Sequence, residues 1–208
     1  PIDFSADLIN AHKNYDKLMP MIHLPVQSGS NKILKSMNRK HSIEDYMELI
    51  YKLKKINPYI KFSSDFIIGF PGETDSDFEQ TLKLLKEVNY INSYSFVFSA
   101  RPGTPAGDLK KVDEKVSKER LIIFQNLANK IKMEYRKTLL NKPSLVMFEN
   151  RTSDKDKFFG RDEYLNSVIV SSKENLKGKI EKVNIINSNQ KTLIGEIANK
   201  SERKHFAA

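Results

Sequence analysis

Three groups of polar residues and glycines accompany short apolar runs that predict β-strands. Gln27 and Ser28 follow the first run, Asp65 and the segment 69–73 belong to the second, and Arg101 follows the third. Because the carboxyl ends of parallel strands meet at one edge of a sheet, we expect these residues to line one pocket. An amide, a carboxylate, a hydroxyl and a guanidinium together suit a small polar ligand. Each residue alone also has a structural explanation, such as an ion pair or a turn.

Arg39 stands just before a helix that is predicted to begin after Ser42. Its guanidinium could hold a ligand carboxylate through two parallel hydrogen bonds, and a surface arginine is the simpler alternative. His23 lies inside the first apolar run, and the other histidines show no metal-ligand spacing, so we expect a hydrogen-bonded core histidine and no metal site. Segment 69–74 lacks the lysine of a phosphate-binding loop, which disfavours nucleotide triphosphate hydrolysis.

The composition limits the chemistry that the chain can perform. Its 208 residues include no cysteine, which excludes disulfides, thiolate catalysis and an iron–sulfur cluster held by these residues alone. The formal net charge is +9, and the excess lies in the second half: residues 1–109 hold 13 Lys/Arg and 13 Asp/Glu, and residues 110–208 hold 22 and 13. A basic segment is typical of a surface that meets nucleic acid, with a merely solubilising surface as the alternative. Without a membrane-spanning run or secretion signal, we expect a cytoplasmic location.

The first half predicts an α/β arrangement. Three apolar runs bounded by turn-forming residues predict buried strands at 21–26, 60–70 and 94–98. Ser42 with Asp45 has the spacing of a capping box, and Thr74 or Asp75 is a candidate cap for the next helix. Strands that alternate with helices favour a parallel sheet.

The second half changes character. Apolar residues at three- and four-residue spacing predict a long helix over about 117–140. Four short strands then follow, at 145–149, 167–171, 179–186 and 191–197. Gly160, Gly178 and Gly195 are interpreted as turns between strands. About 60 residues of this kind suit a five-stranded barrel, with residues 187–190 as a hairpin turn.

Four segments of the first half are more specific than any single residue. They read HLPVQSGS at 23–30, LKSMNRKHS at 34–42, SSDFIIGFPGETDSDFEQT at 63–81 and YSFVFSARPGTPA at 94–106. With these segments in this order, the chain resembles the radical S-adenosylmethionine methylthiotransferases, and the first segment resembles the branch that acts on tRNA. Residues 159–161, Phe-Gly-Arg, resemble part of that family's C-terminal TRAM domain, an RNA-binding β-barrel.

The resemblance implies a fold and a reaction. The α/β fold would be the C-terminal part of a radical S-adenosylmethionine domain (a partial TIM-like barrel) over 1–141, followed by a small all-β TRAM barrel over 142–208. The reaction would convert N6-isopentenyladenosine at position 37 of tRNA to its 2-methylthio derivative, with S-adenosylmethionine and two 4Fe-4S clusters as cofactors. The implied cofactor contacts are Gln27, Ser28, Arg39, Asp65, Gly69 and Gly72. Gln27 and Asp65 would bind ribose hydroxyls, Arg39 the methionine carboxylate, and the glycines would let the backbone approach the nucleoside.

The family holds its clusters with cysteines that are absent from this sequence. We therefore expect the chain to be the C-terminal half of such an enzyme, inactive alone, without a metal site or a catalytic residue of its own. Two alternatives stay open. One is a non-catalytic tRNA-binding protein derived from that enzyme, and the other is a methylthiotransferase that acts on another adenosine derivative of tRNA.

The resemblance also gives the basic second half a partner, the anticodon arm of tRNA. Cationic residues of the long helix, with Arg120 and Arg136 among them, and of the β-module would contact phosphates. In the β-module the RNA contacts would be Arg161, Lys173, Lys177 and Lys179. Phe158, Phe159 and Tyr164 could stack on unpaired bases or fill the barrel core, and we expect at least one of the two phenylalanines to be buried.

Overall fold

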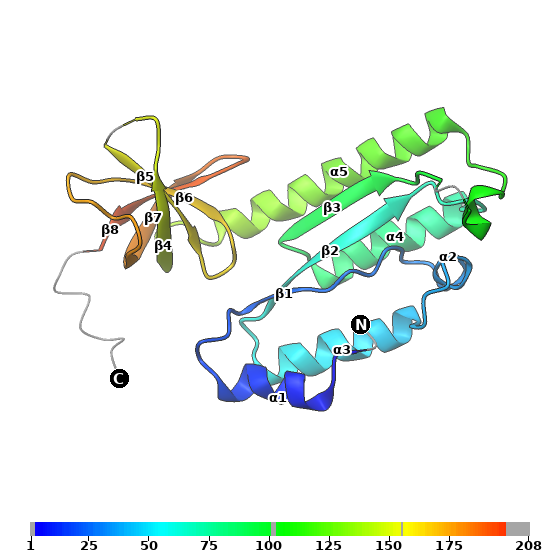
Figure 1. The fold of residues 1–208 in the computed structure, drawn as a ribbon, viewed down its shortest axis with the longest axis horizontal. Helices are drawn as coiled ribbons and strands as arrows, with labels where there is room; N and C mark the ends of the chain where they lie inside the picture. Colours follow the sequence, from blue (N-terminus) through cyan, green and yellow to red (C-terminus); the bar gives the residue numbers. More distant parts are fainter. Residues whose placement is uncertain (1–2, 101–102, 155, 199–208) are drawn as a thin grey trace. The chain divides into compact units, whose positions relative to one another are not determined.

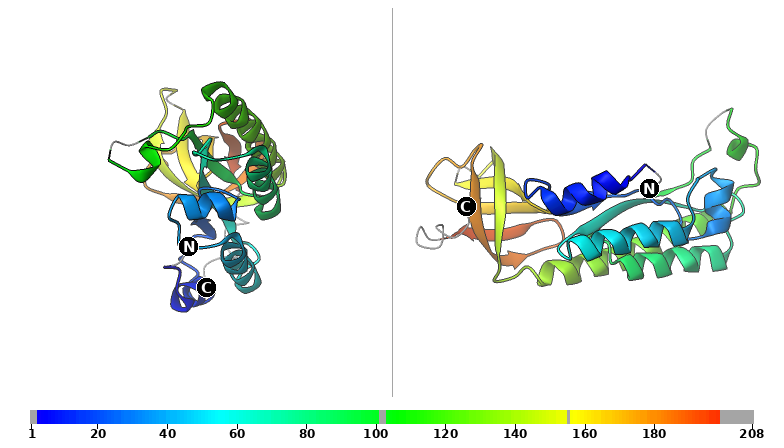
Figure 2. Two further views of the ribbon diagram at one scale, coloured as in Figure 1. Left: turned by 90° about the vertical axis from the view of Figure 1, so that its right-hand side faces the viewer. Right: turned by 90° about the horizontal axis from the view of Figure 1, so that it is seen from below.

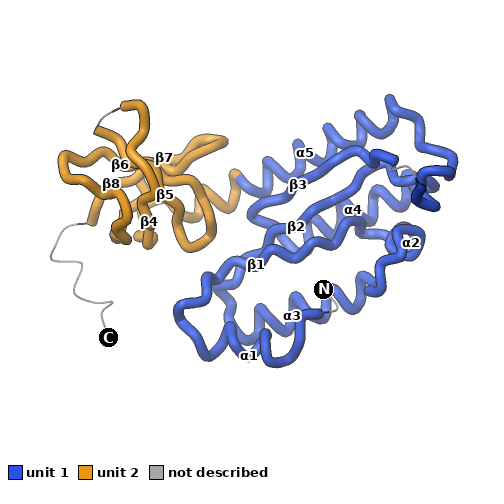
Figure 3. The backbone as a smooth tube through the Cα atoms, viewed as in Figure 1, with its two compact units in different colours: residues 1–132 blue, residues 133–208 orange. Residues whose placement is uncertain are grey.

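The structure is a computed structural model that describes residues 3–100, 103–154 and 156–198. The chain forms two compact units, residues 1–132 and residues 133–208 (Figure 3). The division falls inside the long helix α5 (Glu114–Lys137). The long helix predicted over about 117–140 is thus confirmed, but it begins and ends slightly earlier. None of the helices in the described ranges combines the length and the apolar character that crossing a bilayer requires.

Unit 1 alternates helices and strands (Figure 1). Its elements before α5 are α1 (Ala6–Asn14), β1 (Met21–His23), α2 (Asn31–Ser36), α3 (Ile43–Ile56), β2 (Lys61–Ile68), α4 (Asp75–Val88), β3 (Asn92–Val97) and a 3-10 turn (Pro105–Gly107). The strands form a parallel sheet in the order β1-β2-β3. The α/β arrangement predicted for this half is therefore confirmed.

Local sequence signals explain where the helices begin. Ser42 and Thr74 each form a complete capping box, the first with Asp45 and the second with Asp77. The helix predicted to start at Thr74 or Asp75 is thus capped by Thr74. The short helix α2 was not predicted. Its N-cap is the side chain of Ser30, and Ser30 belongs to a run of turn-forming residues that was interpreted only as a turn.

The core of unit 1 lies on one face of the sheet. Along β2 the alternate residues Phe62, Phe66 and Ile68 are buried among apolar side chains of α3, α4 and α5. These three helices lie on the same side of the sheet (Figure 2). The opposite face is open: Tyr94 and Phe96 of β3 keep 50% and 60% of their surfaces exposed.

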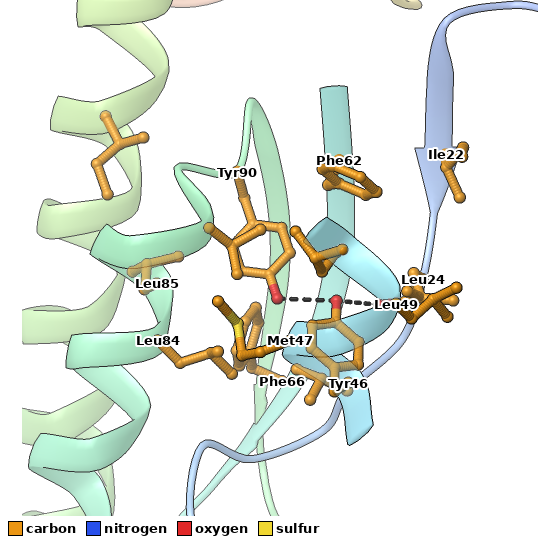
Figure 4. Close-up of a cluster of buried hydrophobic side chains, with 14 of the residues drawn as sticks. Ile22, Leu24, Tyr46, Met47, Leu49, Phe62, Phe66, Leu84, Leu85 and Tyr90 are labelled. Carbon is orange, nitrogen blue, oxygen red and sulfur yellow. Dashed lines mark hydrogen bonds between the residues drawn. The ribbon is translucent and has the colours of Figure 1, made fainter. Parts of the chain in front are cut away.

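A buried pair of tyrosines ties α3 to the chain after β1 (Figure 4). The Tyr90 hydroxyl donates to the Tyr46 hydroxyl at 2.8 Å, and Tyr46 donates to the Leu24 carbonyl at 2.9 Å. Burial raises the pKa of Tyr46 to about 12, so the phenol stays a donor at any physiological pH. The segment that leads into Gln27 is therefore anchored inside the core.

Unit 2 is a closed five-stranded barrel. Its strands are β4 (Pro143–Arg151), β5 (Lys157–Asp162), β6 (Ser167–Ser171), β7 (Ile180–Ser188) and β8 (Leu193–Ile197), in the order β4-β5-β6-β8-β7. The five-stranded barrel is confirmed, and Phe158 is fully buried in its core, as expected for one of the two phenylalanines. The turn between β7 and β8 begins slightly later than predicted.

Strand β5 was missed because Gly160 was interpreted as a turn, and Gly195 was likewise wrongly interpreted as one. Gly160 lies within β5 and Gly195 within β8. A side chain at Gly160 would meet Val146 Cγ1 at 2.8 Å, and one at Gly195 would meet the Asn184 carbonyl oxygen at 2.9 Å. Neighbouring strands approach too closely at these points for a Cβ atom, so each glycine serves barrel closure. Gly178, by contrast, is in a turn with φ of 78°.

Arg136 corrects the prediction that it contacts phosphates together with the other cationic residues of the long helix. Its side chain is 2% exposed, and its guanidinium donates to the carbonyls of Asn189 and Lys191 at 2.7 and 3.2 Å. Burial lowers the pKa of Arg136. This cation therefore fixes the β7–β8 turn and does not meet solvent phosphates.

Asp162 is a buried carboxylate in the barrel. It accepts hydrogen bonds from the backbone N–H groups of Tyr164 and Asn166 and from the Asn166 side chain. Burial outweighs these bonds and raises the pKa of Asp162 from 3.8 to about 6. The folded chain thus keeps a proton that the unfolded chain releases near pH 4.

We predict that Asp162 makes the fold less stable as pH rises. Its favourable contribution is complete below about pH 4 and lost above about pH 6, because only the unfolded chain ionises easily in that window. Relative to Asp162→Asn, the native chain should lose on the order of 3 kcal/mol of unfolding free energy across the window. Urea unfolding at several pH values measures this difference, and parallel pH profiles for the two proteins would contradict it.

Candidate functional site

The open edge of the sheet brings Gln27 and Asp65 together. Gln27 continues the β1 side of the sheet: its N–H donates to the Asp65 carbonyl at 3.0 Å, and its carbonyl accepts from the Ile67 N–H at 2.9 Å. Gln27 has a φ of 75°, which is strained for a residue with a side chain. Such strain persists where surrounding contacts impose it and is typical of ligand-binding turns.

Asp65 belongs to a polar cluster on the open face. Its carboxylate lies 3.4 Å from His23 Nε2, and the other ring nitrogen of His23 is 2.8 Å from the Ser63 hydroxyl. Tyr94, the cross-strand neighbour of Asp65, lies edge-on to the His23 ring. The histidine is hydrogen-bonded as predicted, but it is partly exposed on this face and not in the core.

Ser28 and Gly29 are turned toward α4. Ser28 is 1% exposed; its hydroxyl accepts from the Ser30 N–H and lies 3.5 Å from the Thr81 hydroxyl. The Gly29 N–H donates to Thr81 Oγ1, and a Cβ on Gly29 would come within 2.6 Å of the Gln80 carbonyl oxygen. These contacts give Ser28 a role in docking the turn, and the cofactor contact that the resemblance implied for it stays a prediction.

Asp77 fastens this turn from the other side. It is 4% exposed; its Oδ1 accepts from Ser30, and its Oδ2 accepts from Lys32 and from the hydroxyl and N–H of Thr74. Burial alone would raise the pKa of Asp77, but these hydrogen bonds prevail and hold it well below its usual range. The carboxylate therefore stays charged and joins the turn to the first residues of α4.

The loop after β2 is held by a second buried carboxylate. Glu73 accepts from the Gly69 N–H at 3.1 Å and pairs with Arg120 at 2.7 Å; the two side chains are 1% and 8% exposed. Arg120 also pairs with Asp75, whose side chain is 92% exposed. Burial raises the pKa of Glu73 despite the arginine. Arg120 was predicted to face solvent phosphates, and the structure corrects this: it is a buried partner of the loop.

The two glycines of this loop differ in their surroundings. Gly69 and Gly72 both have positive φ, 72° and 82°. A side chain on Gly69 would collide with the side chain of Ser117, whereas one on Gly72 would meet nothing within 4 Å. Gly69 is thus required by the approach of α5 as well as by the turn. Gly72 is required by the turn alone, and its carbonyl accepts from Lys32.

Arg39 lies at the same end of unit 1, in the connection between α2 and α3. Its side chain is exposed and lies close enough to His41 to lower the pKa of that histidine, although burial is the larger cause. The backbone of Val26, next to Gln27, acts on the pKa of His41 in the opposite direction and raises it. Arg101 lies outside the described residues, so the structure says nothing about its predicted place in the pocket.

The predicted RNA contacts are exposed residues of the barrel. Arg161 lies on the outer face of β5, where it pairs with Glu149 at 2.9 Å and lies over the Phe159 ring. Lys173, Lys177 and Lys179 lie on the connection from β6 to β7. Their role in RNA binding stays a prediction.

The site suits part of a nucleoside cofactor. Gln27 is joined to Asp65 through the backbone, Tyr94 is the cross-strand neighbour of Asp65, and an amide and a carboxylate are the groups that bind vicinal hydroxyls. The same residues do not suit an iron–sulfur cluster, since the sequence has no cysteine. Within the described ranges, no group of three or more His, Asp or Glu residues is arranged to hold a metal ion.

Comparison with known proteins agrees with this geometry. Residues 1–85 match the family model of the radical SAM superfamily. The chain is 52% identical over 204 residues to the tRNA-2-methylthio-N(6)-dimethylallyladenosine synthase of Pelagibacter ubique (strain HTCC1062), an alignment that covers 98% of this chain and 46% of that protein. It is 40% identical over 208 residues to the synthase of the same name from Zymomonas mobilis, covering 100% of this chain and 46% of the relative.

These matches agree with the resemblance seen in the sequence: the chain is similar to part of proteins named tRNA-2-methylthio-N(6)-dimethylallyladenosine synthase, and its residues 1–85 match the radical SAM superfamily. The chain spans about half the length of the curated relatives that it matches.

We predict that Glu73→Gln destabilises unit 1 far more than Asp75→Asn, although both remove an acidic partner of Arg120. The first change leaves the buried arginine beside a neutral group, which costs on the order of 2 to 4 kcal/mol. The second removes only an exposed partner, which costs about 0 to 1 kcal/mol. Urea unfolding of both variants provides the comparison, and equal losses would show that Glu73 does not anchor the loop.

Proposed function

We propose that the chain is part of an enzyme that adds a methylthio group to C2 of N6-isopentenyladenosine at position 37 of tRNA, or of another N6-modified adenosine there. The observation that supports this most strongly is the similarity along almost the whole chain to proteins of that name. The open sheet edge, with Gln27 beside Asp65, provides a place for the nucleoside of S-adenosylmethionine.

In this proposal each residue at the sheet edge has one task. Gln27 and Asp65 bind the ribose hydroxyls, and the exposed guanidinium of Arg39 binds the methionine carboxylate. Gly69 and Gly72 let the backbone approach the nucleoside, and Ser28 keeps the turn in place. The cofactor held by these residues would supply radical chemistry at the substrate.

The electrons for that chemistry come from outside these residues. Two 4Fe-4S clusters of the whole enzyme need cysteine ligands, and this sequence contains none. We therefore propose that these 208 residues are inactive without the rest of the protein. The roles left to them are to bind the cofactor's organic part and to bind tRNA.

The barrel has the second of these roles. We propose that residues 142–208 form a TRAM-like module that binds the anticodon arm through Arg161, Lys173, Lys177 and Lys179, while residues 1–141 belong to the radical domain. Exposed lysines and arginines contact phosphates whatever the sequence. A cytoplasmic location follows from a tRNA substrate.

The enzymatic proposal predicts a product. The chain joined to the cysteine-containing part of a relative, with iron and sulfide restored without oxygen, should form 2-methylthio-adenosine derivatives in tRNA, detected by mass spectrometry. Asp65→Asn should lower the yield by at least about tenfold, because the ribose loses a charged acceptor. A joined protein that binds tRNA but forms no product would favour the non-catalytic alternative and refute the enzyme.

The RNA-binding proposal predicts salt-sensitive affinity for the 208-residue chain itself. Between roughly 50 and 200 mM salt the Kd for tRNA should rise steeply, because binding releases counterions. Replacing Arg161, Lys177 and Lys179 with Ala should weaken binding and reduce the salt slope by about 2 to 3. The matched control replaces the exposed Lys55, Lys83 and Lys86 of unit 1, which changes the net charge equally. Equal losses in both triple variants would refute a specific barrel surface.

A further inference from the structure

The order of the strands identifies one face of the barrel as a candidate for ligand binding. Numbered along the chain, the five strands are arranged 1-2-3-5-4, and the third and fifth, β6 and β8, are parallel. Closed five-stranded barrels of the OB type bind oligonucleotides on the outer face of their second and third strands, with help from nearby loops. In this chain these strands are β5 and β6.

An apolar row crosses that face. Phe159 on β5 is paired with Ile169 on β6, and Ile169 is paired with Ile194 on β8. All three point outward, since their chain neighbours Phe158, Val168 and Leu193 are fully buried inside the barrel. With about 4.8 Å between strands, the row extends for roughly 10 Å, enough for the flat face of a nucleobase.

A surface hollow of about 480 Å³ continues the row beyond β6. Its lining includes the apolar residues Ile169, Ile186 and Ile194 and the polar residues Lys157, Ser171 and Thr192. This combination of apolar lining residues and a few polar groups is typical of a site for a small planar ligand.

Cations border the row on the β5 side. Lys157 and Arg161 lie on either side of Phe159 along the outer face of β5, and the Arg161 guanidinium is 5.4 Å from the centre of the Phe159 ring. Their partners Asp154 and Glu149 are about as exposed as they are, so the pairs are weak and a phosphate can replace the carboxylates. Glu196 lies in the hollow at the other end. A polyanion would therefore place its phosphates along β5 and its bases toward β8.

The wall of the hollow is held rigid from within. Asn189 and Thr192 belong to the β7–β8 turn, and the buried guanidinium of Arg136 donates to the Asn189 and Lys191 carbonyls. The Asn189 side chain accepts from the Thr192 N–H at 2.8 Å. A wall fixed in this way lowers the entropy cost of binding.

We propose that the outer face of β5 and β6 binds an unpaired nucleotide of RNA, with its base stacked on Phe159 and directed along the row toward the hollow, and its phosphate held by Lys157 and Arg161. The proposal rests on the RNA-binding part of the proposed function and adds where and how the barrel contacts RNA. The charge and the half-buried, outward-facing aromatic ring together favour a single strand over a duplex, because only unpaired bases offer their faces.

The chain contains no tryptophan, so one introduced tryptophan reports on its own position. In Phe159→Trp we expect single-stranded RNA of mixed sequence to quench the fluorescence as it binds, and a fully paired RNA duplex of equal length to quench it much less. Phe159→Leu, which keeps an apolar side chain without the ring, should weaken single-strand binding about tenfold.

The matched control is Leu145→Trp, because Leu145 is 49% exposed on β4, where it is paired with Lys182 of β7. Its fluorescence should stay unchanged in the same titration. Quenching at position 145 but not at 159, or unchanged affinity in Phe159→Leu, would overturn the proposal. If either result occurs while the variants still bind tRNA with the salt dependence described above, the RNA-binding role stands and only the assignment to the outer face of β5 and β6 fails.

Discussion

Removing a carboxylate from water costs free energy that hydrogen bonds and cationic partners must offset. In unit 1 two such buried carboxylates hold the loops at the strand ends. Asp77 gathers Ser30, Lys32 and Thr74 around its two oxygens. Glu73 receives the Gly69 N–H and the Arg120 guanidinium. The turn after β1 and the loop after β2 are each fastened to a helix by a buried charge, so the sheet edge between them has a defined shape.

This arrangement separates support from contact. Ser28, Gly29 and Arg120 support the loops, and their polar groups or close packing are used inside the protein. Gln27 and Asp65 are half-buried residues whose backbones are joined by a hydrogen bond, and the Asp65 carboxylate lies 3.4 Å from His23 Nε2. Loops that are already rigid lose less conformational entropy when they bind a flexible nucleoside cofactor, so a rigid supporting layer favours binding.

Sequence patterns predict what depends on neighbours along the chain. The capping boxes at Ser42 and Thr74, the parallel strands and the presence of a barrel follow from local spacing and periodicity. The patterns fail where the third dimension decides. Gly160 was interpreted as a turn, but a glycine is needed there because a neighbouring strand leaves no room for a side chain. Arg120 was predicted to face solvent, but it is buried against Glu73, which is 47 residues away in the chain.

The central claim is that the loops at the sheet edge are ordered before any ligand arrives. Amide hydrogen exchange of Gly29 and Gly69 in the ligand-free chain tests it most directly, since their N–H groups donate to Thr81 and to Glu73. The account predicts protection close to that of the core strand β2. Exchange as fast as in an unstructured peptide at both amides would contradict it.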